Sequence, residues 1–173
     1  MSYAAALGDN LPCYMDTTQE GAAKYRPTPD FHSGGAQGAG VIAHPVFVWA
    51  VEWPLFWRGL GPLWTAGGGE PGLSPAEGFR SVHYREDIVI HRPIVAGDEL
   101  ETTVRVASVE AKAKGSVGTL RCDHVDADGR PVVTSWSSSY YRGVPVDGQP
   151  SVAADLAPPP VSSPPSAAAA GRG

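Results

Sequence analysis

Four stretches in the second half of this 173-residue chain alternate apolar and polar side chains, and that pattern constrains the fold most. Such alternation is typical of strands that bury one face. The predicted strands cover residues 79–90, 99–110, 117–126 and 131–142. Their connections are short, and a parallel connection needs a crossover of a dozen residues or more. We therefore predict an antiparallel meander.

Two turn sequences separate these strands. Residues 91–98, His-Arg-Pro-Ile-Val-Ala-Gly-Asp, hold a proline and a Gly-Asp pair, which favour a turn into a new strand. Residues 126–130, Asp-Ala-Asp-Gly-Arg, hold the Asp-Gly pair that is typical of a tight hairpin. Both turns support the predicted strand boundaries.

An aromatic-rich apolar segment at residues 44–60 precedes the strands, and its large side chains recur near helical spacing. We predict one helix that packs on the sheet and is kinked or ended by Pro54. Residues 2–7 are a short helix candidate, and residues 21–40 and 59–78 are predicted loops, the second either a plain connection or a lid over a site.

The end of the chain has a different composition. From Pro145 onward it consists mainly of Pro, Ala, Ser and Gly, with few large apolar side chains. Such a stretch buries too little surface to offset its ordering entropy. We predict one domain over residues 1–144 and a disordered tail over residues 145–173.

Charge and composition exclude several functions. The formal net charge is −5 and the basic residues are scattered, so we expect no nucleic-acid partner. No apolar stretch approaches the roughly 18 residues of a spanning helix, and no secretory signal is evident, so we expect a cytoplasmic protein without membrane contact.

The cysteines and histidines do not indicate a metal centre. Cys13 and Cys122 lie far apart and match neither a metal-ligand spacing nor a disulfide framework, so reduced structural thiols are expected. His83 and His91 share a face if their strand is regular, with His124 the one arguable third ligand. We expect no metal and no cofactor.

Residues 8–16, Gly-Asp-Asn-Leu-Pro-Cys-Tyr-Met-Asp, and two further segments resemble the MaoC-like dehydratase and (R)-specific enoyl-CoA hydratase family. Its motif is a Gly-Asp, then Asn-Pro, then a His and an acidic residue at fixed steps. Leu11 stands where the motif has Asn, and Tyr14 stands where it has the catalytic His. Residues 40–47 and 82–100 also resemble the family's helix entry and its strand-turn-strand. The motif positions that match are Gly8, Asp9, Pro12 and Asp16.

The resemblance implies an α+β hotdog fold, in which an antiparallel sheet wraps around a central helix. Members act on enoyl or 3-hydroxyacyl thioesters of coenzyme A or acyl carrier protein. They usually work as homodimers or as heterodimers with another hotdog subunit, and the nearest pattern is that of the N-terminal, often non-catalytic half. Family members usually carry a strand before the motif, and its absence would leave a sheet edge for a partner.

The same resemblance assigns candidate site residues. Hydration of a 2-enoyl thioester needs one group that takes a proton from water and one that returns a proton to the α-carbon. Asp9 and Tyr14 are the catalytic candidates. A phenol, with an ordinary pKa near 10, is a poor base at neutral pH. The candidates for substrate binding at the helix mouth, the acyl tunnel or the carrier phosphates are His44, Trp49, His83 and Arg85.

Three functional interpretations follow. The favoured one is a degenerate hydratase or dehydratase subunit that works with a catalytic hotdog partner. The second is a stand-alone biosynthetic dehydratase that uses Asp9 with Tyr14 or with another His. The third is a non-catalytic module that binds acyl thioesters or steers assembly. A thioesterase would need a nucleophile or base on the central helix, where Glu52 is the one carboxylate.

Overall fold

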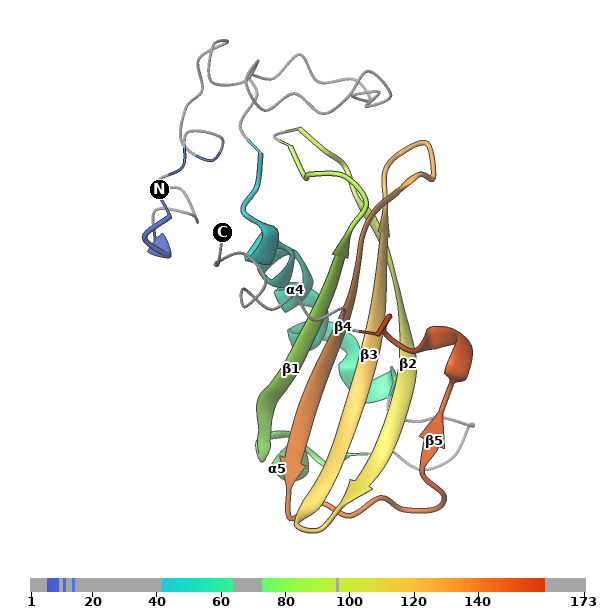
Figure 1. Cartoon of the computed structure of the whole chain (residues 1–173). Helices are drawn as coiled ribbons and strands as arrows, with labels where there is room; N and C mark the ends of the chain where they lie inside the picture. The colour runs from blue at the N-terminus through green and yellow to red at the C-terminus, as the bar shows by residue number, and fades with distance from the viewer. Residues whose placement is uncertain are drawn as a thin grey trace, which may run out of the picture.

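The computed structural model describes residues 6–9, 11, 14, 42–63, 73–95 and 97–160. A helix crosses one face of a five-stranded antiparallel sheet whose order is β1-β4-β3-β2-β5 (Figure 1). The strands are β1 Ser81–Ile90, β2 Glu101–Lys112, β3 Gly115–Val125, β4 Pro131–Arg142 and β5 Ser151–Val152. The helical elements are η1 Pro45–Phe47, α4 Val48–Leu63, α5 Pro75–Gly78 and η2 Ala154–Leu156. The four predicted strands are confirmed, with ends that shift by two residues or fewer.

The predicted strand order is wrong at one place. Strands β2, β3 and β4 form a meander, but β1 pairs with β4 instead of β2. The connection at residues 91–100 crosses the end of the sheet past two strands. Three strand spacings amount to only about 14 Å, which an extended chain covers in about five residues. A short connection therefore does not force its two strands to be neighbours.

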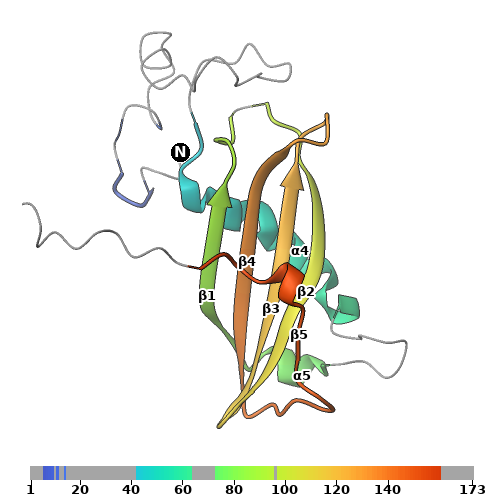
Figure 2. The ribbon, with the colours of Figure 1, turned by 45° about the vertical axis from the view of Figure 1, so that its right-hand side comes forward.

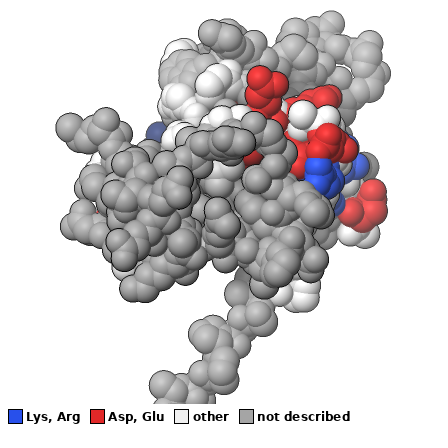
Figure 3. Space-filling model, turned by 90° about the horizontal axis from the view of Figure 1, so that it is seen from above, with Lys and Arg blue, Asp and Glu red and all other residues white. Residues whose placement is uncertain are grey.

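This connection is fixed by an ion pair around Asp98. The Arg92 guanidinium donates to both Asp98 carboxylate oxygens, at 2.8 and 3.1 Å, and the Val95 amide donates to one of them at 2.8 Å. Arg92 also lies 3.5 Å from Asp126 of the β3–β4 hairpin, where Gly129 takes the left-handed conformation that its tight turn requires. Acidic and basic side chains accordingly gather at this end of the molecule (Figure 3).

Pro54 was predicted to kink or to end the helix, and the second alternative is wrong because α4 continues through Pro54. Proline lacks the N–H that would bond the carbonyl of Ala50, but both residues are exposed and water can satisfy that carbonyl. On the opposite side of the helix, Val48 and Glu52 lie one turn apart and are fully buried. The sequence thus places the one carboxylate of α4 against the sheet.

Both faces of the sheet are covered, α4 on one and the C-terminal segment on the other (Figure 2). Under α4, a cluster of Val48, Val132 and Val133 packs with partly buried Ile88, Ile94 and Leu100. On the other face, Ala107, Trp136 and Leu156 pack with Val89 and Ala153. The core is therefore split between the two sides of the sheet.

The predicted disordered tail is wrong for residues 145–160. Strand β5 pairs with β2, and the Ala153 amide donates to the Ala107 carbonyl at 2.9 Å. The Trp136 indole donates to the Leu156 carbonyl at 2.6 Å, and Leu156 is buried. The prediction failed because it rested on average composition, which does not reveal one buried leucine or the backbone hydrogen bonds of this segment. Residues 161–173 lie outside the described residues.

Replacement of Leu156 tests this C-terminal strap. We expect Leu156→Ala to lower the free energy of unfolding by about 2 kcal/mol or more, because it empties a buried site beside Trp136. Val152→Ala removes a side chain that is 64% exposed and should change stability by less than about 0.5 kcal/mol. Urea unfolding measures both, and equal losses would contradict this role of the strap.

The remaining predicted segments are only partly described. The helix candidate at residues 2–7 and the loop at 21–40 lie mostly or wholly outside the described residues, as does Cys13. The predicted loop at 59–78 is helical through Leu63 and again in α5. Among the helices that the structure describes, none is both long and apolar enough to cross a bilayer.

Candidate active site

Asp9 and His44 lie side by side at the entrance to α4. The Asp9 Oδ2 atom is 3.4 Å from His44 Nε2, and their side chains are 29% and 18% exposed. Asp9 follows Gly8, which has a φ of 75° and turns the chain. His44 precedes η1 as its N-cap. Two segments 35 positions apart thus bring a carboxylate and an imidazole together where both can reach solvent.

Backbone amides set the orientation of both side chains. The Val46 amide donates to His44 Nδ1 at 3.3 Å, so this nitrogen acts as an acceptor and the neutral ring carries its proton on Nε2. The Leu11 amide donates to Asp9 Oδ1 at 3.1 Å and leaves Oδ2 toward the imidazole. The pair therefore presents a carboxylate oxygen to an N–H group.

Tyr14 completes this group. Its ring centroid is 5.1 Å from that of His44, with the ring planes tilted by 55°. Its amide donates to the Leu11 carbonyl at 3.0 Å. The tyrosine at the motif's histidine position thus packs against a histidine from another part of the chain.

Trp49 and His83 form a second group. Their ring centroids are 4.8 Å apart in an edge-on arrangement, and Trp53 lies 5.7 Å from Trp49. This places His83 on the α4 side of β1. A bulge between His83 and Arg85 then shifts the alternation, so that His91 reaches Thr134 on the opposite face of the sheet. The two histidines therefore do not share a face.

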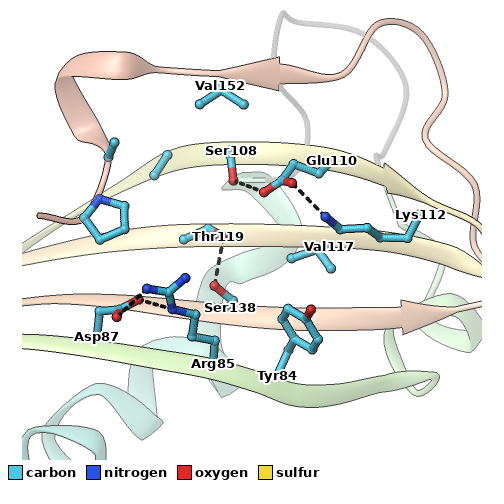
Figure 4. Close-up of a pocket in the computed structure, with 13 residues that line it drawn as sticks. Tyr84, Arg85, Asp87, Ser108, Glu110, Lys112, Val117, Thr119, Ser138 and Val152 are labelled. Atoms are coloured by element: carbon cyan, nitrogen blue, oxygen red, sulfur yellow. Dashed lines mark hydrogen bonds and ion pairs between the residues drawn. The ribbon is translucent and has the colours of Figure 1, made fainter. Parts of the chain in front are cut away.

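Arg85 lies away from both groups. It faces the side of the sheet opposite α4, where Asp87 binds its guanidinium at 2.6 Å (Figure 4). There it lines a cavity of about 260 Å³ together with Tyr84, Glu110, Lys112, Thr119 and Ser138. The structure does not bring Arg85 to Asp9 or His44, and its role in substrate binding stays a prediction.

A buried polar network that was not predicted from the sequence lies beneath α4. Glu52, His124 and Ser135 are at most 1% exposed and are joined by hydrogen bonds. Beside them Cys122 is a free, buried thiol, and burial followed by the charge of Glu52 raises its pKa far above the ordinary range. In the part of the chain that is described, no three His, Cys, Asp or Glu side chains are grouped to hold a metal ion.

Residues 1–135 match the model of a protein family described as the FAS1-like dehydratase domain region. The chain belongs to this family. The likeness to two solved structures shows that it has the hotdog fold that the resemblance implied. The C-terminally truncated HadBC complex from Mycobacterium tuberculosis, a 3R-hydroxyacyl-ACP dehydratase, has a TM-score of 0.58 and 18% identity, over 80% of this chain and 81% of that one. A MaoC-like dehydratase has a TM-score of 0.54 and 22% identity, over 81% of this chain and 36% of that one.

Two curated relatives of this FAS1-like dehydratase-region chain are UPF0336 proteins. The one from Saccharopolyspora erythraea is 38% identical over 68 residues, which are 39% of this chain and 44% of that protein. The one from Clavibacter michiganensis subsp. michiganensis is 38% identical over 64 residues, which are 37% of this chain and 43% of that protein. The match therefore spans less than half the length of each relative.

Proposed function

We propose that this chain adds water to, or removes it from, an acyl thioester of coenzyme A or acyl carrier protein, with Asp9 and His44 as its acid–base pair. The observation that carries the proposal is the 3.4 Å approach of Asp9 Oδ2 to His44 Nε2. Membership of a dehydratase family supplies the reaction class. His44 takes the place of the histidine that Tyr14 replaces in the motif.

The protonation pattern of the pair assigns the two roles. In hydration, the Asp9 carboxylate takes a proton from water as the water oxygen bonds to the β-carbon. The electron pair of the double bond moves toward the thioester oxygen, and the His44 Nε2–H group gives its proton to the α-carbon. The proton on Asp9 then passes to His44 Nε2, which lies next to it, and restores both groups. Dehydration is the same sequence in reverse.

Tyr14 has a supporting role in this proposal. Its ring packs against the imidazole of His44 and restricts how that ring can turn. Its phenol is a hydrogen-bond donor at neutral pH and not a base. Asp9 and His44 therefore carry the proton transfers, and the tyrosine helps to hold one of them in place.

Hydration by the purified chain alone tests the proposal. Crotonyl-CoA loses the absorbance of its conjugated thioester when water adds to it. We expect the purified chain to cause this loss without a second protein. A second hotdog subunit should not be needed, because both acid–base groups belong to one chain. No hydration by the chain, alone or in mixture, of either a short or a long 2-enoyl-CoA would refute the proposed activity.

A degenerate subunit that needs a catalytic hotdog partner is the second candidate. Tyr14 in the motif's histidine position supports it, and so does strand β1, which is an edge of the described sheet. Exposed apolar side chains follow that edge, and such an edge favours pairing with another chain. They are Phe79, Val82, Tyr84 and Ile90. Hydration that appears only in the mixture, together with a heterodimer in native mass spectrometry, would favour this candidate.

A further inference from the structure

Three side chains from α4, β3 and β2 form an ordered chain of hydrogen bonds. Thr102 Oγ1 lies 2.8 Å from His124 Nδ1, and His124 Nε2 lies 2.8 Å from Glu52 Oε1. Thr102 and His124 are direct cross-strand partners, so the sheet register sets the first contact. Glu52 lies on the sheet-facing side of α4, one turn after the core residue Val48. Sheet register and helix packing thus create a hydroxyl–imidazole–carboxylate series.

The partners of each atom fix the direction of these bonds. A carboxylate oxygen can only accept, so His124 Nε2 carries the ring proton and donates it to Glu52. His124 Nδ1 is then an acceptor, and the Thr102 hydroxyl donates to it. The Ser135 hydroxyl also donates to Glu52 Oε1 and holds the carboxylate in position. A hydroxyl that donates to an oriented imidazole is the arrangement of an activated nucleophile.

Thr102 is the one residue of this series that is not fully buried. Glu52 and His124 are 0% and 1% exposed, whereas Thr102 is partly exposed. Stability alone gives little reason for this arrangement, because apolar residues of similar volume often fill such an interface at least as well. Glu52 Oε2 is in addition buried with no hydrogen-bond partner among the described residues.

We propose that Thr102 is an acyl-accepting nucleophile, activated by His124 and oriented through Glu52, and that the chain hydrolyses acyl thioesters at this second site. The substrate class rests on the proposed function. The relay itself involves neither Asp9 nor His44. Its chemistry is acyl transfer to a hydroxyl and then to water, which needs no double bond in the substrate.

The step balances without any further reagent except water. Thr102 Oγ bonds to the thioester carbonyl carbon while its proton moves to His124 Nδ1, and Glu52 stabilises the imidazolium. The carbon–sulfur bond breaks, and the departing thiolate takes the proton from Nδ1. Water then attacks the Thr102 ester and gives a proton to Nδ1. The ester bond breaks, Thr102 Oγ regains that proton, and the free acid leaves.

Butyryl-CoA separates this activity from hydration, because its saturated chain has no double bond to hydrate. We expect the full chain to release coenzyme A thiol from it, and mass spectrometry of a rapidly quenched reaction to find a butyryl ester on the peptide that contains Thr102. Thr102→Val keeps the branched shape without the hydroxyl and should slow thiol release at least tenfold. Thr102→Ser should retain both release and the acylated peptide.

Thr103→Val is the matched control, since Thr103 is the exposed neighbour that faces away from His124. It should leave thiol release unchanged, and the melting temperatures of all three variants show whether they are folded. No thiol release by the wild type, or release that Thr102→Val does not slow, would overturn the proposal. Crotonyl-CoA hydration is assayed in the same variants, so a failure of this second site stays distinct from a failure of Asp9 and His44.

Discussion

We expect Asp9→Asn to lower kcat/KM for crotonyl-CoA hydration by about 10²–10⁴, the usual loss when one acid–base group is removed. Asparagine keeps an oxygen that can accept from the Leu11 amide, so the local turn should persist. It cannot take a proton from water at neutral pH. The measured quantity is the initial rate of loss of enoyl absorbance over a range of substrate concentrations.

His44→Asn should cause a loss of the same order. Asparagine is among the best N-cap residues, so this variant can still accept from the Val46 amide at the start of η1. What it removes is the imidazole beside Asp9. Tyr14→Phe keeps the ring that packs on His44 and should lose less than about tenfold, because the phenol is not a proton carrier in this scheme.

Asp155→Asn is the control for these changes, since Asp155 is an exposed residue of η2 and its side chain belongs to neither group of site residues. It should hydrate crotonyl-CoA at the wild-type rate. A larger loss of kcat/KM for Tyr14→Phe than for His44→Asn would indicate that Tyr14, and not His44, is the catalytic residue. Equal, small losses in Asp9→Asn and His44→Asn would show that the reaction occurs elsewhere.

The sequence predicts the strands and turns well because their signals are local. Alternation along β3 and β4 and the Asp-Gly pair at residue 129 act within a few residues, and the structure follows them. Strand order is not local. Nothing in residues 91–100 specifies that β1 pairs with β4, because strand pairing is set by contacts between residues that lie far apart in the sequence. The structure of residues 145–160 likewise depends on contacts with distant residues, which are the pairing of β5 with β2 and the bond from the Trp136 indole to the Leu156 carbonyl.

In the candidate site, too, the local features could be predicted from the sequence and the long-range contacts could not. The motif and its Gly-Asp turn are enough to predict Asp9 as a site residue. Its contact with His44, 35 positions later, depends on how the chain folds. The bond between Glu52 and His124 spans 72 positions. One signal for it is present in the sequence. Cys122 and His124 occupy alternate positions of β3, as Ser135 and Ser137 do in β4, which indicates a polar row on one face of the sheet.

That polar row includes a carboxyl whose protonation should control stability. Glu86 of β1 lies opposite Ser137, and both of its carboxyl oxygens are buried. Burial, followed by the charge of Glu52, raises the pKa of Glu86 to about 8, and the nearby Ser137 hydroxyl offsets only part of this effect. The folded chain therefore holds this proton at a pH where the unfolded chain has lost it.

The free energy of unfolding should in consequence fall as pH rises from about 5 to about 8, because the unfolded state releases the Glu86 proton first. Each pH unit across a one-proton difference changes it by about 1.4 kcal/mol, and partial solvent contact screens this, so the whole decline attributable to Glu86 is on the order of 2–3 kcal/mol. Urea unfolding of wild type and Glu86→Gln across this range measures it. The variant should lack this decline and be the more stable protein at pH 8.

Glu110→Gln is a control, because the pKa of Glu110 is lowered whereas that of Glu86 is raised. The Lys112 ammonium lowers the pKa of Glu110, so its carboxylate stabilises the fold above the ordinary carboxyl range, and that contribution is lost as pH falls. Removing it should change the low-pH side of the stability profile and leave the decline between pH 5 and 8 in place. If Glu86→Gln and wild type show parallel profiles from pH 5 to 8, Glu86 does not hold a proton in the folded chain. The polar row beneath α4 must then accommodate two ionised carboxylates.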